Sequence, residues 1–150
     1  MYLVIDINEF DNRNVYYQEK VKNTVMENSE FIRIMYSTSY YTLNAIFINF
    51  KLKLNYAEKN FNKYKYFFNR QHNLSNVDEI CKIEKYILDN YNNLKNKKPL
   101  YRISEQLLHN NIKSFNNIYI QETNDFFLKI YGIWENENEY GLTYKITDSY

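Results

Sequence analysis

Residues 46–56, IFINFKLKLNY, carry an apolar side chain at every second position. One face consists of Ile46, Ile48, Phe50, Leu52, Leu54 and Tyr56. The opposite face consists of Phe47, Asn49, Lys51, Lys53 and Asn55. A period of two with one wholly apolar face is typical of a β-strand that buries one side and exposes the other to water. The sequence therefore predicts one continuous strand over these residues, and with it a sheet that covers a core.

A second alternating stretch, FNKYKYFFN (residues 61–69), follows a predicted turn near AEKN (residues 57–60). Its two faces consist of Tyr64, Tyr66 and Phe68 on one side and Lys63, Lys65 and Phe67 on the other. The two stretches predict a β-hairpin. In that hairpin Lys51 and Lys53 share the polar face of one strand, while Lys63 and Lys65 share a face of the return strand.

The period changes to that of a helix after Ser75. A helical stripe is formed by Val77, Ile80, Cys81, Ile87, Leu88 and Tyr91. Asn76 is predicted to cap this helix, with Glu79 completing a capping box, and Pro99 prevents the helix from continuing into NNLKNKKPL. A short helix is predicted around ISEQLLHN (residues 103–110), followed by a strand near FNNIYI (residues 115–120).

The stretch FFLKIYGIWENENEYGLTYKI (residues 126–146) contains both glycines and the single tryptophan of the chain. Its alternation on either side of NENE predicts a hairpin, and a turn centred on Glu137 and Asn138 places Trp134 opposite Gly141. A large ring folded over a cross-strand glycine shields a weak point of a sheet. Glycine within a strand also marks a bulge or a sharp bend. We therefore read Gly132, Trp134 and Gly141 as structural residues of a strongly coiled sheet.

Further strands are predicted at residues 2–7 and 30–37, so the chain is mainly β with one substantial helix. Three strands, a helix and two more strands is the order of the OB-fold, a five-stranded, partly open barrel. The alternative is an antiparallel sheet with a packed helix, of the α+β class. Residues 1–150 suffice for one domain, and no linker or repeat divides them.

Composition narrows the possible functions. The formal net charge is +1, no apolar run approaches the roughly 18–20 residues of a membrane helix, and the first ten residues lack the basic start of a secretion signal. Cys81 is the one cysteine, so an internal disulfide is excluded and a reducing, intracellular compartment is expected. It lies on the predicted apolar stripe, which favours a buried thiol over a nucleophile.

Signatures of catalysis are weak. His72 and His109 lack partners at the spacing of a zinc site, and two glycines cannot build a phosphate-binding loop. The paired carboxylates of ENENE lie at a predicted hairpin tip, where a solvated turn explains them. We therefore expect a non-enzymatic protein without a metal or cofactor, and no membrane as its partner.

Charge is segregated along the chain. Residues 51–70 have a balance of +5, and residues 121–150 have a balance of −4. If the lysine faces of the predicted hairpin coincide, basic groups flank Phe47 and Phe67, as a single-stranded nucleic acid requires. The predicted contacts are Lys51, Lys53, Lys63, Lys65 and Arg70 for phosphates and Phe47 and Phe67 for bases. The alternative is that these lysines keep a sheet edge from aggregating, and that an AT-rich genome explains the abundance of Tyr, Phe, Asn, Lys and Ile.

Two stretches carry a resemblance to a known group of proteins. They are EFIRIMYSTSYYTLNAIFINF (residues 30–50) and residues 126–146, with the patterns F-x-R-I-x-Y-S, T-L-N-x-I and L-K-I-x-G-I-W-E…Y-G-L-T-Y-K. Together, over about 42 of the 150 residues, they resemble short proteins encoded by giant nucleocytoplasmic, mimivirus-like DNA viruses. Ala45 stands where that group has a glycine. The resemblance implies a viral origin, a place in the viral factory of the host cytoplasm or in the virion, and a suspected role in single-stranded DNA binding.

The leading hypothesis is a non-enzymatic, OB-like protein that binds single-stranded DNA or RNA during viral genome replication or transcription. Its partners would be the nucleic acid and, with it, further copies of the chain or viral replication proteins. The rival hypothesis is a structural or assembly protein that acts through protein–protein contacts, with strand addition at an edge near residues 2–7 or with exposed tyrosines as anchors.

Overall fold

The computed structural model describes residues 3–91, 96–114 and 120–148. The strands are β1 (Ile5–Asp6), β2 (Val15–Lys22), β3 (Glu30–Ser37), β4 (Thr42–Leu43), β5 (Ile46–Leu52), β6 (Leu54–Asn60), β7 (Lys63–Phe68), β8 (Lys98–Leu100), β9 (Asn111–Ser114), β10 (Asn124–Glu135) and β11 (Glu139–Thr147). The helices are α1 (Leu74–Asp89) and α2 (Arg102–Leu108), with short 3-10 turns η1 (Ile7–Glu9), η2 (Asn12–Asn14) and η3 (Gln71–Asn73).

The larger sheet is built around β10, its longest strand. Along one side β10 pairs with β11. Along the other side its first part pairs with β5 and its last part with β3, so the sheet forks there. The outer strands are β1 beside β5, β2 and β4 beside β3, and β8 beside β11. Because β1 and β8 run parallel to their neighbours, the sheet is mixed.

A side chain would collide with its neighbours at Gly132 and would be crowded at Gly141. A Cβ at Gly132 would collide with the carbonyl oxygen of Ile32 and lie 2.6 Å from Cζ of Phe31. A Cβ at Gly141 would lie 3.0 Å from the ring of Trp134, which stands opposite it in the register. A bulge interrupts the β10–β11 pairing between Ile130 and Gly132. The predicted register and the packing of Trp134 on Gly141 are therefore confirmed.

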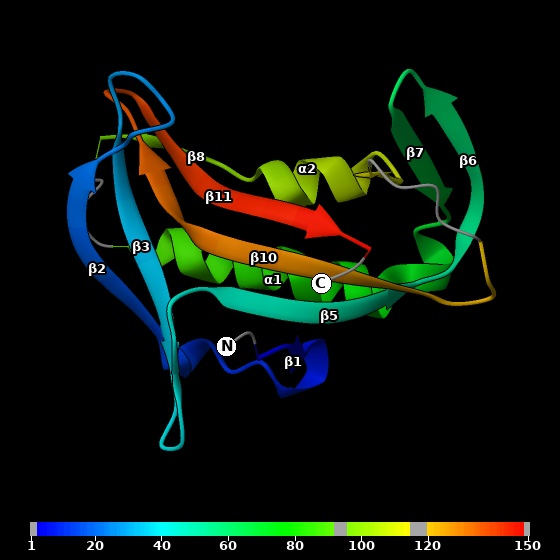
Figure 1. The fold of residues 1–150 in the computed structure, drawn as a ribbon, viewed down its shortest axis with the longest axis horizontal. Coiled ribbons are helices and arrows are strands. Elements are labelled where there is room, and N and C mark those ends of the chain that lie inside the picture. Colours follow the sequence, from blue (N-terminus) through cyan, green and yellow to red (C-terminus); the bar gives the residue numbers. More distant parts are fainter. Residues whose placement is uncertain (1–2, 92–95, 115–119, 149–150) are drawn as a thin grey trace.

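Helix α1 covers one face of the larger sheet, as Figure 1 shows. The core between them includes Ile80, Ile87 and Leu88 from the helix and Phe50 and Leu128 from the strands, all of them fully buried. The outer strand β2 reaches the same helix, because the Tyr17 hydroxyl donates a hydrogen bond to the carbonyl of Ile87 at 2.7 Å. The sheet is thus wrapped around α1, in agreement with the strong coiling expected from the hairpin.

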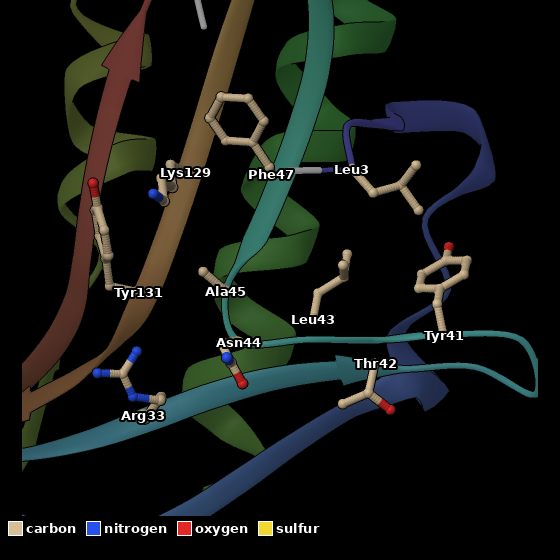
Figure 2. Close-up of a pocket in the computed structure, with 10 residues that line it drawn as sticks. All are labelled: Leu3, Arg33, Tyr41, Thr42, Leu43, Asn44, Ala45, Phe47, Lys129 and Tyr131. Carbon is tan, nitrogen blue, oxygen red and sulfur yellow. The ribbon is translucent and has the colours of Figure 1, made fainter. Parts of the chain in front are cut away.

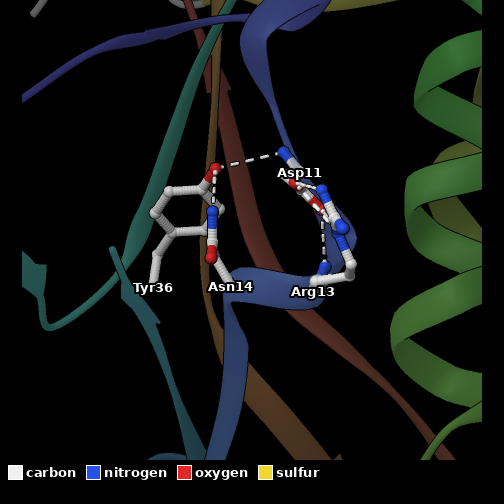
Figure 3. Close-up of polar contacts among 4 residues, drawn as sticks. All are labelled: Asp11, Arg13, Asn14 and Tyr36. Carbon is white, nitrogen blue, oxygen red and sulfur yellow. Dashed lines mark hydrogen bonds and ion pairs between the residues drawn. The ribbon is translucent and has the colours of Figure 1, made fainter. Parts of the chain in front are cut away.

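The N-terminal segment is anchored to β3 by Tyr36, whose ring is buried. Its hydroxyl accepts hydrogen bonds from the backbone N–H of Asp11 at 3.0 Å and from Nδ2 of Asn14 at 3.3 Å, as Figure 3 shows. Asp11 also pairs with the guanidinium of Arg13 at 2.7 Å, and this hydrogen-bonded contact lowers the pKa of Asp11 to about 2. These contacts hold the chain in place just before β2, a strand that was not predicted from the sequence.

A smaller sheet, in the order β6-β7-β9, lies at the opposite end of the molecule from β2 in Figure 1. The prediction of one continuous strand over residues 46–56 is wrong, because the chain leaves the larger sheet at Lys53. Asn73 causes the break: its Oδ1 accepts from the Lys53 N–H at 2.7 Å and its Nδ2 donates to the Lys53 carbonyl at 3.2 Å. The predicted turn at residues 57–60 is also wrong, since these residues belong to β6 and the turn is at Phe61 and Asn62.

The mainly β content with one long helix is confirmed, with about half of the structure in strands. The OB-like five-stranded barrel is not shown, because the described strands form two open sheets. Helix α1 begins earlier than predicted: Asn73 holds the N-cap position, while Asn76 lies inside the helix and donates to the carbonyl of Lys51 at 2.6 Å. Helix α2 confirms the short helix, whereas residues 115–119 of the predicted strand at FNNIYI lie outside the described residues.

Candidate nucleic-acid interface

The structure divides the predicted nucleic-acid contacts between the two sheets. Phe47 and Lys51 lie on β5 of the larger sheet, where Lys51 is opposite Asp125 of β10. Lys53 lies at the break between the sheets, and Arg70 is exposed just before η3. Lys63, Lys65 and Phe67 lie on β7 of the smaller sheet. The four lysines therefore do not share one face, because β5 does not continue into the strand that pairs with β7.

Lys65 and Phe67 line a groove of about 820 Å³ between the smaller sheet, α2 and the end of β11. We refer to it as the basic groove. Sequence reasoning did not find its other cationic residues, which come from three further elements. They are Arg102 of α2, Lys113 of β9 and Lys145 of β11. The remaining lining residues are Glu105, Gln106, His109, Asn111, Tyr144 and Ile146.

Positive charge dominates the basic groove. Four of its lining side chains are Lys or Arg, and Glu105 is the one carboxylate among the described residues that line it. Lys65 and Lys113 stand directly opposite each other in the β7–β9 register. Like charges in directly opposite positions destabilise a sheet. On its other side Lys65 stands opposite Glu58 of β6, which offsets part of this repulsion. The opposed lysines add to the positive charge of the basic groove.

Aromatic rings accompany the charge on the β6–β7 hairpin. The ring of Phe67 stacks on that of Tyr56, with centroids 4.7 Å apart, and the ammonium of Lys65 lies 5.4 Å from the Phe67 centroid. Tyr56 is 52% exposed. At the tip of the hairpin Phe61 is 92% exposed and has a φ of 55°, a left-handed conformation that is unfavourable for a bulky side chain. The hairpin thus presents flat rings to solvent next to ammonium groups.

A buried carboxylate from α1 positions α2 against the groove. Glu84 accepts hydrogen bonds from the backbone N–H groups of Ile103 and Ser104 at 2.9 and 2.8 Å and from the Ser104 hydroxyl at 2.6 Å. Burial raises the pKa of Glu84 in spite of these donors. The first residue of the helix held in this way, Arg102, places its guanidinium 4.8 Å from the ring of Trp134. On the next turn Gln106 accepts from the Tyr144 hydroxyl at 3.2 Å.

Phe47, the second predicted stacking ring, lies elsewhere. It is only 8% exposed and stacks on Phe127 of β10, with centroids 5.7 Å apart. It lines a different pocket, on the face of the larger sheet that α1 does not cover. The structure therefore brings Lys65 and Phe67 together in one site, with Lys63 on the same strand, and does not add Phe47, Lys51, Lys53 or Arg70 to it.

Comparisons with family models, with curated proteins and with solved structures found no match to this chain. Over residues 3–91, 96–114 and 120–148, no three or more His, Cys, Asp or Glu side chains gather where they could hold a metal ion. In the same ranges, neither helix has the length and apolar character of a membrane span.

Proposed function

We propose that this protein binds single-stranded nucleic acid in the basic groove. The observation that carries the proposal is the opposed pair Lys65 and Lys113, placed in a groove with two more cationic side chains and the ring of Phe67. A strand's phosphates would lie along the ammonium and guanidinium groups, and an unstacked base would lie on Phe67. No sequence preference is expected from such contacts, because every base has a flat face.

The exposed rings of the β6–β7 hairpin favour single-stranded over duplex nucleic acid as the ligand. Its exposed Tyr56 and Phe61 can reach only bases that are not stacked within a duplex. Lys63, which shares its strand and face with Lys65, would extend the phosphate track along the same hairpin. In the viral setting that the sequence resemblance implies, the ligand would be the single-stranded DNA or RNA of genome replication or transcription.

Fluorescence anisotropy of a labelled oligothymidine of about 30 nucleotides, at several salt concentrations and with duplex DNA as competitor, tests the proposal. The decisive variant is Lys65→Gln with Lys113→Gln. Each lost phosphate contact lowers the slope of log affinity against log salt by about 0.7. We expect the double variant to bind at least tenfold more weakly, with a slope smaller by about 1.4.

The matched control removes two exposed lysines outside the groove, Lys51 and Lys82, by the same change to Gln. It alters the net charge equally and should leave affinity and slope nearly unchanged. Equal losses in the two double variants would mean that only net charge attracts the nucleic acid. An unchanged slope in the Lys65 and Lys113 variant would overturn the groove as the binding site.

One observation favours the rival, an assembly protein. Among the described strands β2 pairs with β3 alone, and its Tyr16 and Val21 are 54% and 55% exposed. An edge strand with exposed apolar side chains can add a strand from another chain. Light scattering with and without oligonucleotide separates the two functions. A defined oligomer that forms without nucleic acid, and that Val21→Lys dissociates, would support assembly through β2.

A further inference from the structure

A second pocket, of about 830 Å³, lies at the fork of the larger sheet. At the fork β10 changes its partner from β5, which ends its pairing at Ile130, to β3, whose pairing begins at Gly132. Tyr131 stands between these two residues, at the bulge. Figure 2 shows the lining side chains at the fork, in front of the strands, with α1 behind them. We refer to this site as the fork pocket.

Two cations from different strands line the fork pocket. Arg33 of β3 is exposed and stands opposite Gly132 of β10 in the register. Lys129 of β10 stands opposite Phe47 on one side and opposite Lys145 of β11 on the other. None of the described residues that line the pocket is acidic. Because Lys129 and Lys145 occupy directly opposed positions, the positive potential extends across this part of the sheet.

Flat rings lie directly beside this charge. The ammonium of Lys129 is 4.7 Å from the centroid of Tyr131 and 6.0 Å from that of Phe47. Opposite them, the wall formed by residues 41–45 and Leu3 is largely apolar, with the polar side chains of Thr42 and Asn44. The fork pocket therefore has a cationic side and an aromatic and apolar side. Its volume lies in the range of about 300–1,000 Å³ that is typical of small-molecule sites.

We propose that the fork pocket binds a small ligand that joins a phosphate group to a flat ring, the chemistry of a nucleoside monophosphate. The guanidinium of Arg33 offers the bidentate geometry that phosphate oxygens prefer, and Lys129 adds a second charge. The flat ring would pack against Tyr131 and the apolar wall. The two pockets have no lining residue in common, so this proposal does not depend on the basic groove.

Isothermal titration calorimetry tests the proposal with the four nucleoside 5′-monophosphates, the corresponding nucleosides and inorganic phosphate. We expect at least one monophosphate to bind at sub-millimolar concentration, and its nucleoside and inorganic phosphate to bind at least tenfold more weakly. Arg33→Gln should weaken the monophosphate at least tenfold. Lys22→Gln, at an exposed lysine outside the pocket, is the matched control and should change nothing.

The outcomes separate the two sites. The double variant Lys65→Gln, Lys113→Gln should keep its monophosphate affinity, and Arg33→Gln should keep its affinity for an unphosphorylated oligonucleotide. No binding of any monophosphate at millimolar concentration, or equal affinity of Arg33→Gln and the folded native chain, would overturn the fork pocket. Thermal unfolding of Arg33→Gln verifies that the variant is folded.

A 5′-phosphorylated oligonucleotide, compared with its 5′-hydroxyl form, identifies the source of the ligand. A gain in affinity from the 5′-phosphate that disappears in Arg33→Gln would show that the pocket takes the end of a strand. Binding of free monophosphates without such a gain would show that it takes a separate small molecule. Both results support a phosphate-and-ring site.

Discussion

The hairpins β10–β11 and β6–β7 are both rich in aromatic residues and use them in opposite ways. Trp134 of β10 is 3% exposed, lies over Gly141 and is covered by Arg102. Tyr56 of β6 and Phe61 at the tip of the second hairpin are largely exposed. The abundance of rings in a sequence therefore says little about function. The neighbours of each ring in the fold decide whether it stabilises the core or remains available to a ligand.

The position of the strands in their sheets explains the difference. Strand β10 has hydrogen-bonded partners along both of its edges, and most of its residues are buried. Strand β6 is at the edge of a three-stranded sheet and carries Glu58 and Lys59 on an exposed surface. Charged side chains on an edge strand oppose pairing with other chains. On this edge Tyr56 is exposed, and it stacks on Phe67 of the central strand β7, which lines the basic groove.

Gly132→Ala should have the largest effect, because the added Cβ collides with the backbone carbonyl of Ile32 and with the Phe31 ring. Separating β3 from β10 is the one way to relieve these contacts, and we expect a loss of about 3 kcal/mol in the free energy of unfolding. Gly141→Ala is the matched variant in the same hairpin. Its Cβ meets the Trp134 ring at 3.0 Å, and a loss of about 1 kcal/mol is expected.

Urea unfolding of both variants measures the difference. We conclude that the close approach of β3 requires glycine at position 132. Equal losses of stability in the two variants would contradict this conclusion.

Glu84→Ala should cause the second-largest loss of stability. Helix α2 lies between the two hairpins, and this carboxylate holds it in place. The substitution leaves the N–H groups of Ile103 and Ser104 without their acceptor, at a cost of about 2–3 kcal/mol. Affinity for oligothymidine should fall as well, since Arg102 begins the helix that Glu84 holds.

The pH dependence of stability tests the raised pKa of the Glu84 carboxyl in the folded protein. Burial raises its folded pKa above the ordinary value of 4.5, so the folded state binds the proton more tightly than the unfolded state. The contribution of Glu84 to stability is therefore full below pH 4.5 and is lost as pH rises through the raised pKa. Glu84→Gln should remove this component from a series of urea titrations between about pH 4 and 8. An identical pH profile in the variant would show that another group titrates.

Phe67→Ala tests whether an aromatic ring of the exposed β6–β7 hairpin contributes to binding. We expect a loss of about 1–2 kcal/mol in oligonucleotide binding, the size of one stacking contact, and a smaller change in stability. Anisotropy and urea unfolding on the same sample separate the two effects. Leu108→Ala, at an exposed apolar residue outside the groove lining, should leave binding unchanged.

Phe61→Asn should change the stability least, and the direction of that change is informative. Asn tolerates the left-handed conformation at φ 55° better than Phe, so stability should rise by about 0.5–1 kcal/mol. Binding of oligothymidine should weaken, because a ring at the tip is lost. A variant that is more stable and binds equally well would show that the strained Phe61 has no part in recognition.

Several features could be predicted from the sequence because they depend on neighbouring residues. The register that sets Trp134 opposite Gly141 follows from the position of one turn. The apolar stripe of α1 and the alternating faces of β7 follow from backbone periodicity. The break at Lys53 could not be predicted, because Asn73 makes it from twenty residues further along the chain. Residues 46–56 have the same alternating pattern whether the strand continues or is broken.

The candidate site divides in the same way. The sequence by itself determined that Lys65 and Phe67 share one face of a strand, since a period of two is a property of every extended chain. Only the tertiary structure decided that Arg102, Lys113 and Lys145 face the same groove, and that Phe47 belongs to another pocket. The physical reason is that periodicity is set residue by residue by backbone geometry. Convergence of charges from separate elements is instead set by which apolar faces bury one another, and no short stretch of sequence contains that choice.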